Sequence, residues 1–476
     1  MGDYGANLNV IAFCFSFLVE ICYFCFLKQY KDMVMKNTPI DYRKVKEVID
    51  SYGLPDFGKA TIREVVEISG RLEKETNTEF IHMEMGVPGL KPAQVGVEAE
   101  IKALQHGIAA VYPNINGLPK LKQEASRFVK AFIDVDVAPE GCVPVTGSMQ
   151  GTYASFLTCG QCDPQKDTIL FIDPGFPVQK QQIVVMGYKL ASFDVYEYRG
   201  EKLKPILEQY LCQGNIAAIT YSNPNNPAWF CFTADELKII GEMATRYDTI
   251  VIEDLAYFAM DFRKELGRPF QPPYQPSVAN YTDYYIIQIS ASKVFSYAGQ
   301  RIGVTAISDK LYRRTYPGLT QRYGGGTFGS AYIHRALYAL SSGTSHSAQF
   351  ALAAMFKAAS DGTLDFVEDV KEYGRRAAKL KQIFTKHGFR IVYDRDLDKP
   401  VADGFYFTIA YPGMTGGQLM EMLIYYGISA ISLSTTGSNQ EGLRICTSFV
   451  KPHQYELLDE RLNLFEENLK CLMNNE

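Results

Sequence analysis

The most conspicuous candidate for a chemical role in this sequence is a lysine in an apolar setting. Lys293 follows the run YYIIQIS (residues 284–290), whose apolar and β-favouring residues are typical of a strand that enters a core. Burying a charged amine is costly, and desolvation lowers the pKa of a lysine. A buried Lys293 could therefore be neutral and act as a nucleophile or as a base.

Three more polar residues come directly after predicted strands. Ser148 follows CVPVTG, Asn226 follows IAAITYS, and Asp254 ends TIVIED. Alone, each of the four residues also suits a structural role, as a helix cap, a turn residue or, for the lysine, a side chain that reaches solvent. In an open α/β sheet, however, ligands bind at the carboxyl ends of the parallel strands. The joint placement of all four residues favours a binding site there.

These residues need a sheet to position them, and the sequence predicts one. The predicted strands are DTILFID, IAAITYS, TIVIEDLAY, YYIIQIS and RIGVTAIS, each bounded by Gly, Pro, Asn or Asp. Helical patterns lie between several of them, such as TADELKIIGEMATRY, which opens on a threonine cap with a glutamate three residues later. This alternation predicts an α/β fold with a mostly parallel sheet that helices cover on both faces.

Further elements predict a second, smaller α+β domain. SHSAQFALAAMFKAAS and the stretch at 365–389 have helical patterns, and GFYFTIAY and GLRICTSF are typical of strands. At 476 residues the chain exceeds a single ordinary core, so we expect two closely joined lobes. We place the large domain at residues 81–349 and the small domain at 35–80 together with 350–476.

Composition and charge argue against several classes of protein. The net charge is −5 with acidic and basic residues interspersed, which argues against a nucleic-acid-binding protein. The ten cysteines form no disulfide or zinc pattern, and the one CxxC, Cys159 to Cys162, is interpreted as ordinary buried thiols in a reducing compartment. The six histidines lack HxxxH spacing, so we expect no metal site.

The N-terminal segment, residues 1–34, leaves two interpretations open. VIAFCFSFLVEICYFCFL (residues 10–27) is an apolar run, interrupted by one glutamate, at the lower length limit for a membrane span. It is either an anchor that leaves the rest of the chain on the cytoplasmic side, as Lys28 and Lys31 favour, or a non-native extension upstream of a later start methionine. We therefore expect a cytoplasmic protein, tethered to a membrane only if the anchor is genuine.

Seven motifs in a fixed order resemble one enzyme family. They are YPNINGLPKLK, GSMQG, DPGFP, NPNNP, EDLAY, SASKVFSYAGQRIG and LRICTSF, and they cover most of residues 80–450. Together they resemble the class I/II, aspartate-aminotransferase-like family of fold-type I pyridoxal-phosphate enzymes. The SxSK element with Arg301 eight residues beyond Lys293 is unusual by itself.

The resemblance implies a pyridoxal 5'-phosphate cofactor and a role for each matching residue. Lys293 would form an aldimine with the cofactor aldehyde and later act as the general base for the substrate α proton. Asp254 would pair with the pyridine nitrogen. Asn226 and Tyr257 would hydrogen-bond the phenolic oxygen, and Phe176 would lie against the ring face.

The same resemblance assigns the phosphate and substrate contacts. The phosphate would be bound by Ser148, the backbone amide of Met149, Ser290 and Arg301. Arg444 would bind the substrate α-carboxylate with its bidentate fork, beside Gly86 and Asn226. Tyr112 would reach the phosphate of a neighbouring subunit, which predicts a homodimer with shared active sites.

Three features depart from the family pattern. Ala228 and Trp229 stand where the family commonly continues the NPxNP element with Thr-Gly, which changes the turn beyond Asn226. Met149 replaces a polar residue often seen after the phosphate-loop serine. The glycine-rich YGGGTFGS (residues 323–330) is either a mobile lid or, as we favour, a surface loop.

The expected activity is that of an aminotransferase. The amino group of an L-amino acid would move to a 2-oxo acid, with 2-oxoglutarate as the expected acceptor, by a ping-pong mechanism through Lys293. Elimination by a lyase with the same fold and cofactor is the alternative, since the motifs do not separate the two outcomes. A membrane-tethered binding protein without catalysis would not need Lys293, Asp254 and Arg444 together. Without a recognisable second arginine for a distal carboxylate, dicarboxylic, aromatic and aliphatic substrates all stay open.

Overall fold

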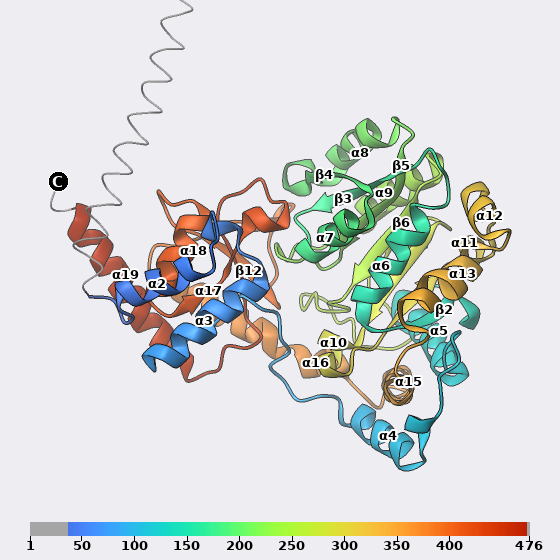
Figure 1. Cartoon of the computed structure of the whole chain (residues 1–476), viewed down its shortest axis with the longest axis horizontal. Coiled ribbons are helices and arrows are strands. Elements are labelled where there is room, and N and C mark those ends of the chain that lie inside the picture. Colours follow the sequence, from blue (N-terminus) through green and yellow to red (C-terminus); the bar gives the residue numbers. More distant parts are fainter. Residues whose placement is uncertain (1–36, 474–476) are drawn as a thin grey trace, which may run out of the picture.

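The computed structural model describes residues 37–473, and the segment at 1–34 with its predicted anchor or extension lies outside the described residues. Among the described helices, none combines the length and apolarity that a membrane crossing requires. This part of the chain forms two bodies: a larger one around a central sheet, and a smaller one in which N-terminal and C-terminal elements lie together (Figure 1).

The larger body contains a seven-stranded sheet in the order β2-β8-β7-β6-β5-β3-β4. Its strands are β2 (Cys142–Val145), β3 (Thr168–Asp173), β4 (Lys189–Asp194), β5 (Ile216–Ser222), β6 (Ile250–Leu255), β7 (Tyr285–Ser290) and β8 (Gly303–Ile307). β8 pairs antiparallel with both β2 and β7, while every other pair of neighbours is parallel. The prediction of a mostly parallel sheet is confirmed, and RIGVTAIS is the one predicted strand that runs against the others.

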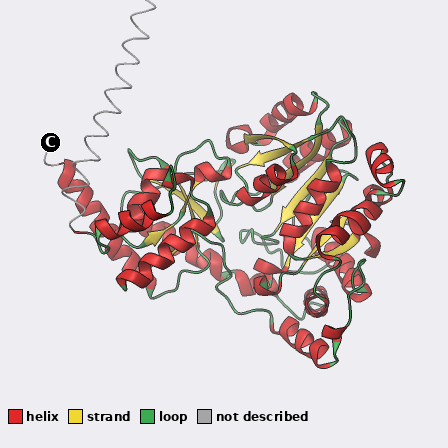
Figure 2. Ribbon diagram, viewed as in Figure 1, coloured by secondary structure: helices red, strands yellow, loops and turns green. Residues whose placement is uncertain are grey.

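Helices cover both faces of this sheet (Figure 2). They include α4 (Gln94–Gln105), α5 (Pro119–Ile133), α6 (Gly147–Cys159), α7 (Pro177–Met186), α8 (Leu203–Leu211), α9 (Ala234–Arg246), α10 (Ala291–Val294) and α15 (His346–Ser360). The predicted cap of α9 is present, because Thr233 and Glu236 form a reciprocal capping box. Along β6, Val251 packs into one hydrophobic cluster and Ile252 into another. A sheet buried on both faces explains why its strands are nearly continuous apolar runs.

Short helices follow β8 along the outside of the larger body. They are α11 (Asp309–Arg313), α12 (Pro317–Tyr323), α13 (Phe328–Ala331) and α14 (Tyr338–Ser341), with a π-helical turn at Tyr332–Leu337. Within the glycine-rich stretch 323–330, only Gly324–Gly326 and Thr327 connect α12 to α13, and all three glycines have positive φ. Our interpretation as a loop therefore fits the first half of the stretch, whereas its second half is helical.

The smaller body is α+β, as predicted. Its helices are α2 (Tyr42–Ser51), α3 (Ile62–Thr76), α17 (Glu372–Lys386), α18 (Gly416–Tyr425) and α19 (Gln454–Met473). The short helix α16 (Phe366–Val370), which precedes α17, packs its apolar side chains into the core of the larger body. An antiparallel sheet joins β14 (Ile431–Ser432), β15 (Leu443–Cys446), β12 (Tyr406–Ala410) and β9 (Arg390–Ile391). β1 (Ile81–His82) pairs with β13 (Ile428–Ser429), and β10 (Arg395–Asp396) forms a hairpin with β11 (Lys399–Pro400).

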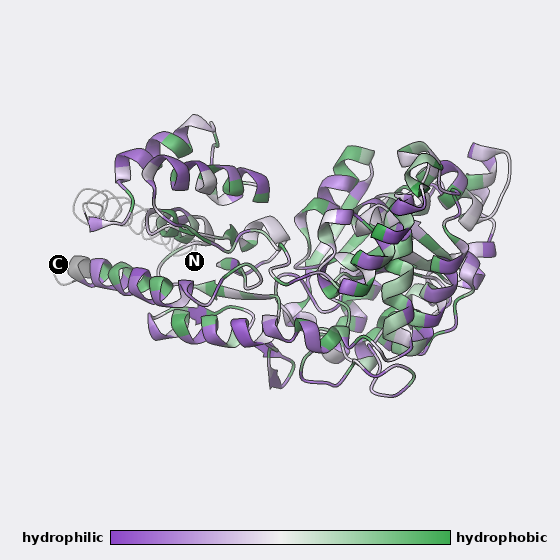
Figure 3. Cartoon of the chain, turned by 90° about the horizontal axis from the view of Figure 1, so that it is seen from below, coloured by the Kyte–Doolittle hydropathy of each residue, from purple (hydrophilic) through white to green (hydrophobic). Residues whose placement is uncertain are grey.

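One hydrophobic core unites the two ends of the described chain. It draws residues from 40–83 and from 380–469, which explains how segments so far apart in sequence share one body. Apolar positions gather inside both bodies, and hydrophilic residues cover the outward helix faces (Figure 3). The predicted division at 349/350 falls inside α15, which packs against α4 and α5 of the larger body. The domain boundaries stay a proposal.

The CxxC pair lies at the end of α6 and consists of buried thiols. Burial raises the pKa of both Cys159 and Cys162, so neither thiol is a nucleophile at neutral pH. In residues 37–473, no group of three or more His, Cys, Asp or Glu side chains is arranged to hold a metal ion.

Candidate active site

The carboxyl edge of the central sheet gathers most of the residues with predicted roles. Ser148 lies in the first turn of α6 after β2, Asp254 lies in β6, and Lys293 lies in α10 directly after β7. The reversed direction of β8 adds Arg301 to this edge, because Gly303 at the start of β8 pairs with the last residues of β2 and β7. Arg301, which comes just before the antiparallel strand β8, therefore lies at the same edge as Ser148 and Lys293, which come just after β2 and β7.

Lys293 is held by a short helix whose start is capped. The Ser290 hydroxyl accepts a 3.1 Å hydrogen bond from the Ser292 backbone amide, and this cap begins α10. The Lys293 amine donates to the carbonyl oxygen of Gly86 and lies 5.3 Å from the centre of the Phe405 ring. Burial lowers the pKa of this amine to about 8, which makes a neutral, nucleophilic lysine accessible near physiological pH.

Asp254 is a buried carboxylate with two hydrogen-bond donors. Its oxygens accept from the backbone amide of Ala256 at 3.1 Å and from the side chain of Gln179 at 2.8 Å. Burial raises the pKa of Asp254 to about 6, and the two donors oppose that shift, so the group is ionised at neutral pH. Gln179, in the first turn of α7, was missed by sequence reasoning, which stopped at Phe176 in the same motif.

A chain of polar contacts connects the larger and smaller bodies. Arg444 donates from Nη1 to the Asn226 side-chain oxygen at 3.3 Å, and the Asn226 amide lies 3.3 Å from the Tyr257 hydroxyl. The Tyr257 hydroxyl donates in turn to the hydroxyl of Tyr406 at 3.0 Å. Sequence reasoning also missed Tyr406, although its position in GFYFTIAY on β12 places it opposite Cys446 on β15.

Arg444 is almost completely buried, at 1% exposure, and only part of its donor capacity is used. Its Nη2 donates to the backbone oxygen of Glu84, while Nε finds no partner among the described residues. The guanidinium lies 4.6 Å from the centre of the Tyr406 ring. A buried, planar cation with a free donor is suited to a carboxylate ligand.

Gly86 allows the backbone to pass close to the Tyr406 hydroxyl. A Cβ at this position would collide with the Tyr406 hydroxyl, so no larger residue fits without displacing that ring. The backbone from Glu84 to Gly86 supplies the oxygens that bind Arg444 and Lys293. Gly86 thus lies in the segment that contacts both Arg444 and Lys293, and its role toward a substrate carboxylate stays a prediction.

The start of α6 forms a cradle for an anion. Gly147 has φ of +68°, and a Cβ there would collide with the Arg301 guanidinium. The Ser148 hydroxyl is buried without a hydrogen-bond partner among the described residues. Arg301 donates to the Ala298 backbone oxygen at 2.7 Å and keeps part of its fork exposed. Met149 lies in the same turn, where its carbonyl accepts from Gln182 at 2.8 Å.

Two predicted residues stand apart from these contacts. Phe176 is half-buried at the start of α7, and no contact ties its ring to Lys293 or Asp254. Tyr112 is 92% exposed, on the loop before α5. The adjacent Val111 backbone oxygen contacts the His346 ring at 3.0 Å, which fixes the loop that presents Tyr112 outward. Their roles toward a ring face and a neighbouring subunit stay predictions.

The donor set fits a phosphorylated aromatic aldehyde such as pyridoxal 5'-phosphate. The unpartnered Ser148 hydroxyl, the glycine-lined approach at Gly147 and the exposed fork of Arg301 suit a phosphate. Asp254 is ionised and suits a protonated ring nitrogen, and Lys293 has the low pKa that attack on an aldehyde requires.

Comparison with known proteins identifies the family. The sequence model of the family described as "Aminotransferase class I and II" matches residues 78–462, and the chain belongs to this family. The aspartate aminotransferase of Pyrococcus horikoshii is 24% identical over 257 residues, which are 54% of this chain and 61% of that protein. The glutamate-pyruvate aminotransferase of Escherichia coli is 27% identical over 230 residues, 47% of this chain and 53% of that protein. The matched region thus spans about 60% of the length of such relatives.

Solved structures share the fold over nearly their whole length. The aspartate aminotransferase of Thermotoga maritima superimposes with a TM-score of 0.68 at 16% identity, covering 90% of this chain and 99% of that one. The alanine aminotransferase of Pyrococcus furiosus gives 0.67 at 18% identity, covering 85% and 96%. These similarities establish the fold-type I architecture that the motifs implied.

Proposed function

We propose that the protein is a pyridoxal-phosphate-dependent aminotransferase that moves an amino group from an L-amino acid to a 2-oxo acid. The observation that carries this proposal is the meeting of a low-pKa lysine, a buried carboxylate and a buried arginine around one sheet edge. Lys293, Asp254 and Arg444 together serve no purpose in a mere binding protein, whereas transamination needs all three. Family membership supports the same conclusion.

The residues that would hold the cofactor divide into four groups, for its phosphate, ring nitrogen, phenolic oxygen and ring face. Gly147, Ser148, Ser290 and Arg301 would hold the phosphate, with the backbone of Met149 at the start of α6. Asp254 would pair with the ring nitrogen, and Asn226 and Tyr257 would contact the phenolic oxygen. Phe176 would lie against the ring. When bound, pyridoxal phosphate supplies an aldehyde that captures amines and a ring that takes up electrons released at the substrate α carbon.

The protein side of the reaction consists of orientation and proton transfer. Arg444 would grip the α-carboxylate with its fork, beside Gly86, and so fix the α carbon relative to the Lys293 amine. The neutral Lys293 amine would take the proton from the substrate α carbon and deliver it to C4′ of the bound cofactor, as its lowered pKa permits. Asp254 would keep a proton on the ring nitrogen because its two hydrogen bonds hold it ionised.

Three further features are part of the proposal. The outward presentation of Tyr112 supports a homodimer in which this residue completes the neighbouring subunit's site. The six described cysteines are free thiols, which supports a reducing, cytoplasmic setting. The acceptor would be a 2-oxo acid such as 2-oxoglutarate.

Purified full-length protein tests the proposal directly. The holoprotein should show a visible absorbance band that changes on adding amino acids, and borohydride should fix the cofactor to Lys293. A panel of amino donors should yield keto acid only when 2-oxoglutarate or another acceptor is present. Release of ammonia without an acceptor would show elimination instead, and a failure of borohydride to label Lys293 would overturn the proposal altogether.

A further inference from the structure

Trp229 has a backbone conformation that suits glycine rather than a large side chain. Its φ is +65°, in the left-handed region where a Cβ is disfavoured. At this place the NPxNP element of the family commonly has glycine, as noted above. A strained bulky residue persists only where the surrounding structure determines it, and such residues cluster at functional sites.

Local hydrogen bonds hold the strained turn. The Trp229 amide donates to the Asn225 backbone oxygen at 3.0 Å, and the Asn225 amide donates to the Phe230 oxygen at 3.0 Å. The Asn225 side chain, which is fully buried, also accepts from the Ala228 amide at 3.0 Å. Backbone and side-chain hydrogen bonds of Asn225 therefore hold the turn on both sides of Trp229.

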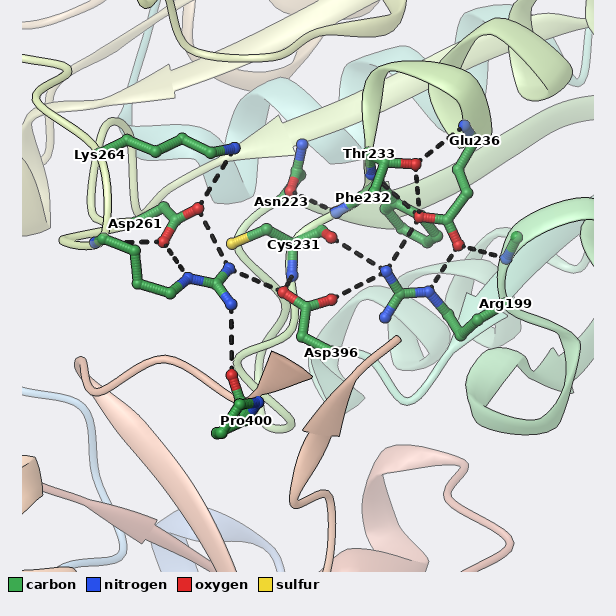
Figure 4. Close-up of polar contacts among 12 residues, drawn as sticks. Arg199, Asn223, Cys231, Phe232, Thr233, Glu236, Asp261, Lys264, Asp396 and Pro400 are labelled. Atoms are coloured by element: carbon green, nitrogen blue, oxygen red, sulfur yellow. Dashed lines mark hydrogen bonds and ion pairs between the residues drawn. The ribbon is translucent and has the colours of Figure 1, made fainter. Parts of the chain in front are cut away.

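A buried ionic network then clamps the exit of this turn (Figure 4). The Cys231 amide donates to the carboxylate of Asp396 on β10 at 3.1 Å, and the Cys231 oxygen accepts from Arg199 at 3.0 Å. Arg199 is itself held between Glu236 at 2.7 Å and Asp396 at 3.0 Å. The position of Trp229 is thus fixed by charged groups from both bodies of the molecule.

The indole of Trp229 packs against the polar contacts of the candidate site. It is fully buried, with its ring 5.3 Å from Tyr257 and 6.2 Å from Tyr406 in edge-on arrangements. These are the two tyrosines whose hydroxyls are 3.0 Å apart. Gly404 also leaves room for the indole, because a Cβ there would overlap the indole ring.

We propose that Trp229 is a positioning residue: its indole, packed against Gly404 and the two tyrosine rings, fixes the hydroxyl of Tyr257 where it meets the cofactor. The proposal rests on the proposed function, since Tyr257 is the residue assigned to the phenolic oxygen. Edge-on aromatic contacts restrict the tilt of a ring, and a restricted hydroxyl makes a better-aligned hydrogen bond. Trp229 would therefore act through Tyr257 on the ionisation of the lysine–cofactor chromophore.

The test is a pH titration of the visible band of the full-length holoprotein. The variants are Trp229→Phe, Trp229→Gly, Tyr257→Phe and the double variant Trp229→Phe with Tyr257→Phe. Each single variant should move the titration midpoint in the same direction by about half a pH unit or more, the effect of one hydrogen bond. The double variant should match Tyr257→Phe alone, because Trp229 acts through that hydroxyl.

A variant at Gly404 tests the same packing without changing Trp229 or Tyr257. Gly404→Ala keeps both tyrosines and the indole but takes the space that the indole fills, so it should move the midpoint as Trp229→Phe does. In the double variant Gly404→Ala with Trp229→Gly, the new Cβ at position 404 no longer meets an indole, so the crowding caused by Gly404→Ala should be relieved. Phe193→Leu is the matched control, because Phe193 stacks on Tyr210, away from the candidate site, at 5.6 Å between ring centres.

The outcomes are separable from failure of the proposed function. If the wild-type protein shows no visible band and Lys293 is not labelled, the proposed function fails. If that band is present but the Trp229 variants leave its midpoint in place, or their shifts add to that of Tyr257→Phe, Trp229 is not a positioning residue. If Trp229→Gly fails to fold, the midpoints of Trp229→Phe and Gly404→Ala decide whether Trp229 is a positioning residue. Trp229 is also the only tryptophan of the chain, so quenching of its fluorescence reports cofactor binding independently of activity.

Discussion

The side-chain amide of Gln179 donates a 2.8 Å hydrogen bond to the carboxylate of Asp254, and both residues are buried. This contact opposes the effect of burial, which raises the pKa of Asp254 to about 6. The helix α7 thus does more than carry the predicted ring-stacking Phe176. It also keeps Asp254 ionised and oriented.

The first prediction concerns this donor. Gln179→Leu removes the hydrogen bond to the charged form of Asp254, so the pKa of that carboxyl rises further above 6. Asp254 then becomes protonated at a higher pH, and the acid limb of the kcat/KM profile should shift upward by about one pH unit. Gln182→Leu is the control, because Gln182 on the same helix bonds to Met149 and Thr152. Equal acid limbs for both variants and the wild type would contradict the prediction.

The second prediction concerns the stability of the cofactor-free protein. The pKa of Lys293 is lowered to about 8 from 10.5, so below pH 8 the folded state holds a charged amine at a desolvation cost. As pH rises from 8 to 10.5, the unfolded chain retains more protons than the folded one, and stability increases. Lys293→Met should therefore be more stable than wild type at pH 7, by about 3 kcal/mol, with the gap closing by about pH 10.5.

Urea unfolding at both pH values measures this difference. Lys180→Met supplies the contrast, because Lys180 pairs with the buried carboxylate of Asp173. Removing that partner leaves a buried charge uncompensated, so Lys180→Met should lower stability. A Lys293→Met protein that is less stable than wild type at pH 7 would show that the amine is solvated.

The third prediction concerns Arg444. Lysine keeps the charge but cannot form the bidentate fork, so Arg444→Lys should lower kcat/KM for the amino donor by about 10- to 100-fold. The visible band should be retained, since the proposed partner of Arg444 is the substrate rather than the cofactor. Arg461→Lys is the matched control: Arg461 is also buried and donates to the backbone oxygens of Gly427 and Glu79, in the core of the smaller body. If Arg444→Lys and Arg461→Lys lose kcat/KM equally, the effect of Arg444→Lys would be due to impaired folding rather than to loss of a substrate contact.

The residues at the sheet edge could be predicted because their signals are local. Ser148, Asp254 and Lys293 each follow an apolar run, and the end of such a run is visible in a one-dimensional pattern. The direction of β8 was missed, although a signal existed. Twelve residues separate Ser290 from Gly303, which is the lower limit for the crossover that two parallel strands need.

Gln179 and Tyr406 could not be assigned from the sequence for a different reason. At the start of β12, the side chains of Tyr406 and Phe407 point to opposite faces, and only pairing with β15 decides which face meets the site. Gln179 is one of several glutamines in α7, and its role depends on which turn of the helix meets β6. Both assignments depend on tertiary register, which local patterns do not contain.

The fourth prediction concerns the buried network in Figure 4. Asp396 on the β10–β11 hairpin binds Arg199 at 3.0 Å and Arg263 at 2.7 Å, and each guanidinium also pairs with a second carboxylate, Glu236 for Arg199 and Asp261 for Arg263. Asp396→Ala leaves each guanidinium with that second carboxylate, but it removes charge-assisted hydrogen bonds and the acceptor of the Cys231 amide, so it should reduce the free energy of unfolding by about 1–3 kcal/mol. The exposed Asp398 on the same hairpin is the control, and Asp398→Ala should change stability by less than about 0.5 kcal/mol.

Salt dependence distinguishes this network from a surface ion pair. Added salt screens exposed charges but reaches buried ones poorly, so the difference between wild type and Asp396→Ala should stay nearly constant from low to high ionic strength. Asp396 also accepts from the Cys231 amide, so its loss frees the exit of the turn that carries Trp229. Asp396→Ala should therefore shift the visible-band titration as Trp229→Phe does, whereas Asp398→Ala should not. If Asp396→Ala is destabilised but its visible-band titration is unchanged, the network contributes to stability and does not position the indole of Trp229.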